Sequence, residues 1–216
     1  MTQDLFASIE EAPAQEALDE GAWLLRGLAE VAAPDLLATI ADVASTAPFR
    51  HLVTPGGFRM SVAMTNCGAY GWVSDRRGYR YDPLDPESGQ PWPALPGAFL
   101  ALGRQAANAA GYARFEPDVC LINRYTPGTR LTLHQDRDEG DFAHPIVSVS
   151  LGVPATFLWG GVARGGKTRR YALHHGDVVV WGGPSRLRFH GIAPLKEGNH
   201  PLTGDIRFNL TFRRAR

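Results

Sequence analysis

Two histidines and one aspartate in this chain have the residue types and the spacing of a metal site. His134 and Asp136 lie at the end of a strand-like run, Leu131–His134, and side chains two residues apart on an extended strand point to the same side. His190 offers a third donor further along the chain. Two imidazoles and one carboxylate on one face leave coordination positions open, a set that suits non-haem Fe(II). These residues therefore predict a ferrous iron site.

A second His-x-Asp pair, His175 and Asp177, competes with the first for this role. The pair flanks Gly176 between two strand-like runs, Arg170–His174 and Val178–Trp181, which predicts the turn of a β-hairpin. We therefore expect the first pair to bind the metal and the second to shape a turn.

Composition and charge narrow the class of protein. The 216 residues suit one domain with a full hydrophobic core. The formal net charge is +0 at pH 7, so a nucleic-acid site would have to be local. The two cysteines are far apart, which favours a reducing compartment over a disulfide framework. Neither a signal peptide nor a membrane-spanning apolar run is evident, and we expect a cytoplasmic protein with no membrane partner.

The second half of the chain alternates short strand-like runs with turn signals, which is typical of an antiparallel sandwich or jelly roll. Helical spacing of apolar residues predicts helices at Pro34–Ala44 and Pro96–Ala110, whereas Ala22–Arg26 resembles a strand. Residues 1–20 predict a loose or helical lead-in. The predicted strands of the second half are Val119–Tyr125, Leu131–His134, Ile146–Leu151, Thr156–Trp159, Arg170–His174, Val178–Trp181, Leu187–His190 and Ile206–Arg213.

Residues 50–95 are rich in aromatic residues, glycine and proline, so we expect loops and short hairpins there rather than core. Loops on a rigid scaffold often carry binding sites, and aromatic side chains stack on planar ligands. The alternative is that these aromatic residues pack on the outside of the sheet.

The last predicted strand alternates strictly between polar and apolar residues. One face carries a polar set, and the other carries Phe208, Leu210 and Phe212. The polar face is either a solvated outer surface or a site for a small dicarboxylate, because guanidinium groups form bidentate pairs with carboxylates. An amide and a phenol likewise share one face of Val119–Tyr125. The polar set is Arg207, Asn209, Thr211 and Arg213, and the amide and phenol belong to Asn123 and Tyr125.

Seven stretches, taken together, resemble the AlkB family of Fe(II)- and 2-oxoglutarate-dependent dioxygenases, which repair alkylated nucleic acid. The resemblance covers nearly the whole chain and is weakest before residue 20 and at residues 162–170. It implies a mainly β fold with flanking helices. A double-stranded β-helix (jelly roll) core at 116–216 would follow an extension at 1–115 with a nucleotide-recognition lid near residues 50–95, all in one structural unit. The stretches are Val53–Gly57, Met60–Asn66, Leu121–Tyr125, His134–Asp136, Ile146–Gly152, His175–Gly183 and Arg207–Arg213.

The resemblance assigns three residues to iron and five to 2-oxoglutarate. The metal ligands are His134, Asp136 and His190, and the cofactors are Fe(II), 2-oxoglutarate as co-substrate and O2. Arg207 with Tyr125 would pair with the distal carboxylate of 2-oxoglutarate, and the other three residues would hold the end that chelates the metal. The five are Asn123, Tyr125, Arg207, Asn209 and Arg213.

Substrate contacts are implied in the same way. Trp72 would stack on an extruded base with His134 on its other side. Asp138 would accept a hydrogen bond from the exocyclic nitrogen beside the methyl group, although on the residues alone Asp138 and Glu139 are interpreted as solvated loop acids. Contacts to phosphate, the lid or the pocket wall are implied for Thr54, Met64, Tyr79 and Arg164.

The implied reaction is oxidative demethylation of N1-methyladenine and N3-methylcytosine in single-stranded DNA and in RNA, with release of formaldehyde, succinate and CO2. We expect a monomer that repairs DNA alkylation damage. Two alternatives stay open: an oxygenase of the same fold acting on a protein or small molecule, and a non-catalytic jelly-roll module. The basic, glycine-rich segment 163–170 either adds phosphate contacts or forms a flexible hairpin tip.

Overall fold

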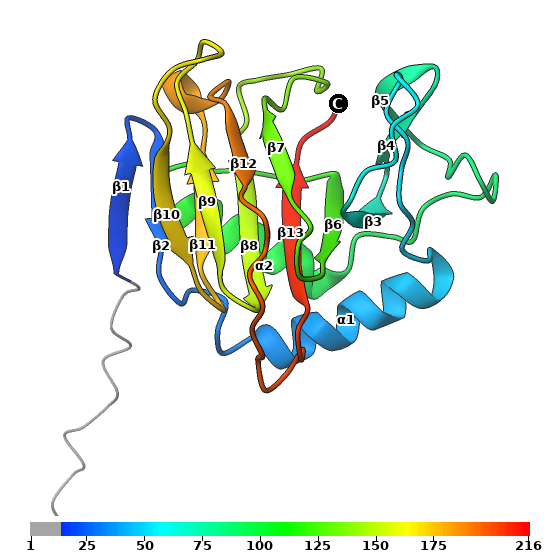
Figure 1. Ribbon diagram of the computed structural model, residues 1–216, viewed down its shortest axis with the longest axis horizontal. Helices are drawn as coiled ribbons and strands as arrows, with labels where there is room; N and C mark the ends of the chain where they lie inside the picture. Colours follow the sequence, from blue (N-terminus) through cyan, green and yellow to red (C-terminus); the bar gives the residue numbers. More distant parts are fainter. Residues whose placement is uncertain (1–13) are drawn as a thin grey trace, which may run out of the picture.

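Two β-sheets packed face to face, with two helices on the outer side of one sheet, form the fold (Figure 1). The computed structural model describes residues 14–216. The helices are α1 (Ala33–Thr46) and α2 (Gly97–Ala109), and a short 3-10 turn is η1 (Gly183–Ser185). The strands are β1 (Gln15–Asp19), β2 (Ala22–Leu25), β3 (Ala63–Gly68), β4 (Gly71–Asp75), β5 (Gly78–Asp82), β6 (Val119–Tyr125), β7 (Leu131–His134), β8 (Ile146–Gly152), β9 (Ala155–Trp159), β10 (Arg169–Leu173), β11 (Val178–Trp181), β12 (His190–Ile192) and β13 (Arg207–Arg213).

The larger sheet has seven strands in the order β1-β2-β11-β8-β13-β6-β3, and the smaller sheet has four in the order β10-β9-β12-β7. Every neighbouring pair is antiparallel. The two sheets form the predicted jelly roll, and β4 and β5 make a separate hairpin at one side of it (Figure 1). No helix within residues 14–216 has the length and apolar character needed to cross a bilayer.

Alternation along the central strands divides the molecule into two cores. Leu210 and Phe212 of β13 point outward into a cluster with the helices, together with Val147 and Val149 of β8. A second cluster, which includes Trp159 and residues of both sheets, fills the space between the sheets. The polar residues of β13 face this interior side, so the jelly roll has a polar region on its inner wall beside an apolar core.

The helices form where apolar spacing predicts them. In α1, Pro34 occupies the first turn, where its missing N–H costs no hydrogen bond, and Leu36, Ile40 and Val43 form the buried stripe. In α2, the ring of Phe99 packs edge-on against Phe212 of β13, with centroids 5.9 Å apart. Both helices therefore hold the outer face of the larger sheet and leave its inner face free for a site.

Three sequence predictions about local structure are wrong. The strand predicted at Leu187–His190 begins at His190, because the turn that starts at η1 keeps the preceding residues out of extended pairing. The lead-in at 1–20 contains strand β1, which pairs with β2, while its residues 1–13 lie outside the described part. The segment 50–95 forms the expected short hairpin, β4–β5, but the expectation that it stays out of the core is wrong, because it also contributes β3, whose six residues are all buried and pair with β6.

The turn around Asp177 also differs from its prediction. The strands on either side, β10 and β11, lie in different sheets, so the segment is a corner between sheets and not a hairpin turn. Asp177 is buried there and accepts hydrogen bonds from Arg26 Nη1 at 2.8 Å, Gly27 N at 3.0 Å and His174 N at 2.9 Å. Its carboxylate therefore joins the corner to the chain after β2, and the expectation that it shapes a turn is confirmed.

Replacing Asp177 with alanine is expected to reduce stability. The change leaves the partly buried N–H of Gly27 and that of His174 without their acceptor and removes one of the partners of Arg26, which should lower the free energy of unfolding by about 2 kcal/mol. Urea unfolding of the metal-free protein measures this. The matched control is Asp205→Ala at an exposed aspartate, which should change the stability by less than about 0.5 kcal/mol. Equal effects of the two variants would contradict the role of Asp177.

Candidate active site

The predicted metal ligands come together at the edge where β7 and β12 pair. His134 ends β7, His190 begins β12, and the two are register partners. Asp136 follows β7 by two residues, and its two carboxylate oxygens lie 3.6 Å from His134 Nε2 and 3.6 Å from His190 Nε2. One donor atom from each residue lies within 4.8 Å of the others, a spacing that fits a single metal ion.

Hydrogen bonds fix which imidazole nitrogen is available to a metal. His134 Nδ1 lies 2.8 Å from the carbonyl oxygen of Thr132, and His190 Nδ1 lies 3.0 Å from that of Arg188. A carbonyl oxygen only accepts, so both Nδ1 atoms carry the proton and donate it. Both Nε2 atoms are left with a lone pair that faces Asp136, as metal ligation requires.

The charges around the ligands favour the forms that bind metal. Burial opposes ionisation of Asp136, but the positive charge of Arg213 and the contacts with His190 and His134 together outweigh it and hold the pKa of this carboxyl well below its usual range. Arg213 donates to Asp136 Oδ2 from Nε at 3.1 Å and from Nη2 at 2.9 Å. Loss of water around the ring, followed by repulsion from His190, lowers the pKa of His134 to about 4. Both groups are therefore deprotonated at neutral pH, which suits a divalent cation.

A buried ion network lies behind Asp136. Glu139 accepts hydrogen bonds from Tyr81 Oη at 2.7 Å, and its carboxylate pairs with Arg186 Nη2 at 3.1 Å and Arg213 Nε at 3.3 Å. Arg186 also donates to the backbone oxygen of Asp136 at 2.8 Å. The interpretation of Glu139 as a solvated loop acid is therefore wrong: it and Arg186 are site residues that the polar local sequence gave no reason to select.

The polar face of β13 points into the interior, so its interpretation as a solvated outer surface is wrong. Arg207 is 1% exposed and lies over the ring of Tyr125, 5.0 Å from its centroid, and these two residues are register partners. Arg207 donates from Nη2 to Ser150 Oγ at 3.0 Å, while its Nε and Nη1 have no partner among residues 14–216. Asn123 Oδ1 and Arg213 Nη1 are also buried without a partner. Buried unpaired cationic donors fit an anionic ligand such as a carboxylate.

One cavity of about 970 Å³ joins these groups to the lid. It is lined by every sequence-predicted site residue except Arg207, which lies in the wall beside Tyr125. The lid residues in the cavity lining are Thr54, Met64, Trp72 and Tyr79, joined by Asp138 and Arg164 from other segments. The structure therefore brings together residues from the whole length of the sequence, as the resemblance implied.

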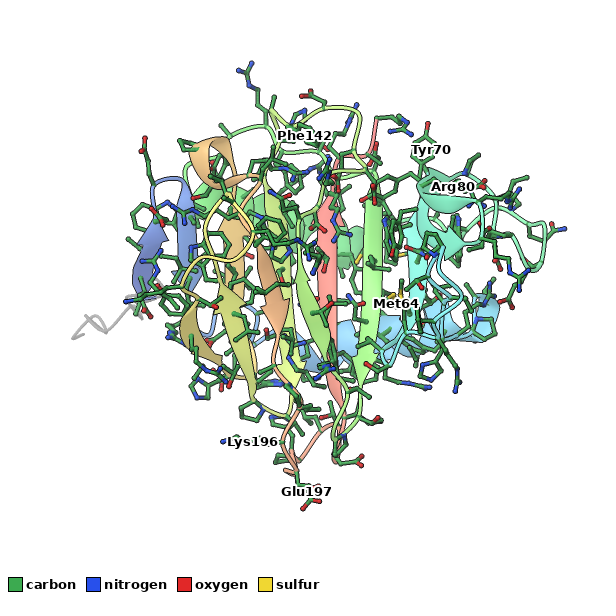
Figure 2. The ribbon with its side chains drawn as sticks, turned by 45° about the horizontal axis from the view of Figure 1, so that its top comes forward. Met64, Tyr70, Arg80, Phe142, Lys196 and Glu197 are labelled. Carbon is green, nitrogen blue, oxygen red and sulfur yellow. The ribbon has the colours of Figure 1, made fainter. Side chains whose placement is uncertain are left out.

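The lid wall is built on strand β3 and on the hairpin of β4 and β5. Met64 lies on β3, next to β6 (Figure 2), and Trp72 lies on β4 with its ring stacked on Tyr79 of β5, at 5.5 Å between centroids and 12° between planes. The indole Nε1 of Trp72 donates to Asp138 Oδ2 at 2.8 Å. Asp138 lines the cavity, and its Oδ1 accepts no hydrogen bond from residues 14–216, so this oxygen is available to a ligand.

The low pKa of His134 makes the stability of the metal-free protein depend on pH. The unfolded chain takes up a proton near pH 6.5 and the folded protein only near pH 4, so the stabilisation is complete above pH 6.5 and is lost as the pH falls towards 4. Urea unfolding measures the drop in the free energy of unfolding from pH 7 to pH 5. This drop should be smaller in His134→Gln than in the parent protein, by on the order of 1 kcal/mol once the partial exposure of His134 is allowed for. An equal drop in the free energy of unfolding in both proteins would contradict the lowered pKa of His134.

Comparison with known proteins agrees with this geometry. Residues 21–213 match the model of the 2OG-Fe(II) oxygenase superfamily. The chain is 62% identical over 212 residues to the alpha-ketoglutarate-dependent dioxygenase AlkB of Salmonella typhimurium, covering 98% of this chain and 97% of the relative. The AlkB of Escherichia coli is 60% identical with the same coverage.

A solved structure and a more distant relative extend the comparison. The structure of OsALKBH1 superposes with a TM-score of 0.83 at 30% identity, covering 93% of this chain and 100% of that one. A relative of Arabidopsis thaliana named DNA N(6)-methyladenine demethylase ALKBH1D is 41% identical over 108 residues, which is 45% of this chain and 24% of the relative. The chain belongs to the 2OG-Fe(II) oxygenase superfamily and, within it, to the AlkB family of alpha-ketoglutarate-dependent dioxygenases.

Proposed function

We propose that this dioxygenase removes methyl groups from N1-methyladenine and N3-methylcytosine in single-stranded DNA and in RNA, and so repairs alkylation damage. The observation that carries the proposal is the single cavity that has His134, Asp136 and His190 on one side and the aromatic lid of Trp72 and Tyr79 on another. A metal centre that faces a stacking surface suits a planar base removed from its helix.

The metal and co-substrate are assigned to the residues that the resemblance implied. His134, Asp136 and His190 would hold Fe(II) through two Nε2 atoms and one carboxylate. The free N–H groups of Arg207, beside Tyr125, would bind the distal carboxylate of 2-oxoglutarate. The residues that would hold the chelating end of 2-oxoglutarate are Asn123, Asn209 and Arg213.

The bound Fe(II) would supply the oxidative chemistry, in which O2 and 2-oxoglutarate are converted to succinate and CO2 and the hydroxylated N-methyl group is released as formaldehyde. The chain itself binds and orients. Trp72 and His134 would hold the base between them, while the free oxygen of Asp138 would accept from the exocyclic nitrogen and offset the positive charge of the ring. Met64 would close the pocket wall.

Arginines at the cavity supply the local positive charge that the neutral chain as a whole lacks. Arg59, Arg130, Arg137 and Arg164 all line the cavity, and Thr54 lies beside them. These side chains would contact the phosphates on either side of the extruded nucleotide. The basic segment 163–170, which includes Arg164, is exposed over most of its length and would extend this contact.

We also propose that the chain acts as a monomer in the cytoplasm. The support for the cytoplasm is that Cys67 and Cys120, although far apart in the sequence, are register partners on β3 and β6 and yet are free thiols, as expected in a reducing compartment. The division into an extension at 1–115, with the lid near residues 50–95, and a core at 116–216 stays a proposal. It is supported by the lid residues that line the cavity opposite the metal site.

The activity is tested with a single-stranded oligonucleotide that contains one N3-methylcytosine. With Fe(II), 2-oxoglutarate and ascorbate, the protein should release formaldehyde, and Asp136→Ala should lower the rate at least about 100-fold because a ligand is lost. Asp177→Ala is the matched control: its rate per folded molecule should stay close to that of the parent. Trp72→Ala should raise KM for the oligonucleotide about tenfold. No change of KM would favour the alternative substrate, a protein or small molecule.

A second experiment separates the two arginines of β13. Arg207→Lys loses the planar fork and should raise KM for 2-oxoglutarate about tenfold or more, while leaving Mn(II) affinity unchanged. Arg213→Ala should raise KM and also weaken Mn(II) binding, because Asp136 loses its ion pair. Isothermal titration with Mn(II) and steady-state kinetics give the two readings. Equal changes in KM and in Mn(II) affinity in the two variants would contradict the assignment of Arg207 to the distal carboxylate and of Arg213 to the metal end of the site.

A further inference from the structure

An exposed phenylalanine stands at the rim of the active-site cavity. Phe58 lines the cavity with Trp72 and Tyr79, yet it is 76% exposed, more than any other aromatic side chain in residues 14–216. A single exposed apolar residue is common on protein surfaces and needs no explanation by itself. Phe58, however, lies beside a cavity for which a planar ligand is proposed, and an exposed aromatic ring can stack on such a ligand.

The backbone presents the Phe58 ring from an ordered hairpin. Thr54 N donates to the Phe58 carbonyl at 2.9 Å, and Phe58 N donates to Thr54 Oγ1 at 3.1 Å. The tip turns at Gly57, where φ of +84° favours glycine, and Gly57 N donates to the Thr54 carbonyl at 2.8 Å. Ser74 Oγ donates to the Val53 carbonyl at 2.8 Å, which anchors the hairpin to β4. The backbone that carries the ring is already fixed in this way, so less backbone freedom has to be lost when a ligand stacks on the ring.

The surroundings of Phe58 combine an aromatic surface with positive charge. Arg59 follows it in the sequence, and Arg130 and Arg164 line the same cavity. Aromatic rings next to cations that follow a phosphate backbone are the usual composition of a surface for single-stranded nucleic acid. The stack of Trp72 on Tyr79 is already assigned to the extruded base, so Phe58 provides a separate aromatic face on the same lid.

We infer that Phe58 is a stacking platform for the nucleobase next to the extruded one, an inference that rests on the proposed function. Every base has a π face, so the contact tolerates any neighbouring sequence while it favours a polynucleotide over a free nucleotide. Phe58 thereby adds a contact to the neighbouring nucleotide of the nucleic acid, and this contact does not depend on which base is methylated.

The test measures binding of fluorescent five-nucleotide single-stranded DNA with a central N3-methylcytosine, in Mn(II) and 2-oxoglutarate at one fixed salt concentration. Three DNAs are compared: the intact strand, one with an abasic site 5′ to the lesion, and one with an abasic site 3′ to it. Phe58→Ala should bind the intact strand about tenfold more weakly. The abasic site on one side should weaken the parent protein by a similar factor and leave the variant unchanged.

Two further variants serve as controls. Phe58→Trp keeps a stacking face and should bind like the parent. Leu202→Ala alters another exposed apolar residue, on the loop that also carries Lys196 and Glu197 at the opposite end of the molecule from Phe142 (Figure 2), and should have no effect. Equal weakening of the parent and Phe58→Ala by both abasic sites would overturn the inference. So would a Phe58→Ala protein that binds DNA normally but changes its oligomeric state in sedimentation. A parent protein that binds these strands in Mn(II) but releases no formaldehyde from them when Fe(II), O2 and ascorbate replace the Mn(II) would refute the proposed function instead.

Discussion

The ion pair between Asp136 and Arg213 is the contact on which the site depends. Both side chains are almost fully buried, and removing two charges from water is costly unless each finds a partner. Arg213 is at the end of β13 in the larger sheet, whereas Asp136 follows β7 in the smaller sheet. The pair therefore joins the two sheets at the metal centre. Glu139 and Arg186 surround it with further charge, so the cluster is balanced by two acids and two arginines.

The same balance explains why the inner wall of a β-sandwich can be polar here. On β13 and β8 the outward residues are apolar and pack on the helices, and this packing stabilises the sheet. The inward residues are thereby free to be polar: Arg207 donates to Ser150 Oγ, and Asn209 donates to Ser148 Oγ. The donors that stay unpaired in Arg207 are a cost that a bound dicarboxylate would relieve. Stability and binding are thus assigned to opposite faces of the same strands.

Much of this arrangement could be predicted because it depends on local periodicity. The strict alternation of Arg207–Arg213 and the helical spacing in α1 both survive in the structure. The surroundings of Asp177 and Glu139 could not be predicted from the local sequence. The local sequence predicts a hairpin turn at Asp177, but the strands on either side of it belong to different sheets. It predicts a solvent-exposed Glu139, but ion pairs with Arg186 and Arg213, which are distant in the sequence, keep this residue buried.

The resemblance to a family supplied what periodicity could not. No local pattern connects Trp72 or Thr54 with residues far along the chain, yet the cavity lining contains both beside the metal ligands. Phe58 and Arg186 were selected by neither route. Their position becomes apparent only from the exposed surface of one side chain and the ion pairs of the other.

The hydrogen bond from the Trp72 indole to Asp138 has a mechanical consequence. Trp72 belongs to the β4–β5 hairpin, and Asp138 is two residues from Asp136 on the same short segment. If the hairpin swings outward, either this bond breaks or the segment that carries the iron-binding carboxylate is pulled along with it. A single hydrogen bond therefore ties the hairpin to the segment between Asp136 and Asp138, and any opening of the hairpin must break this bond or displace Asp138.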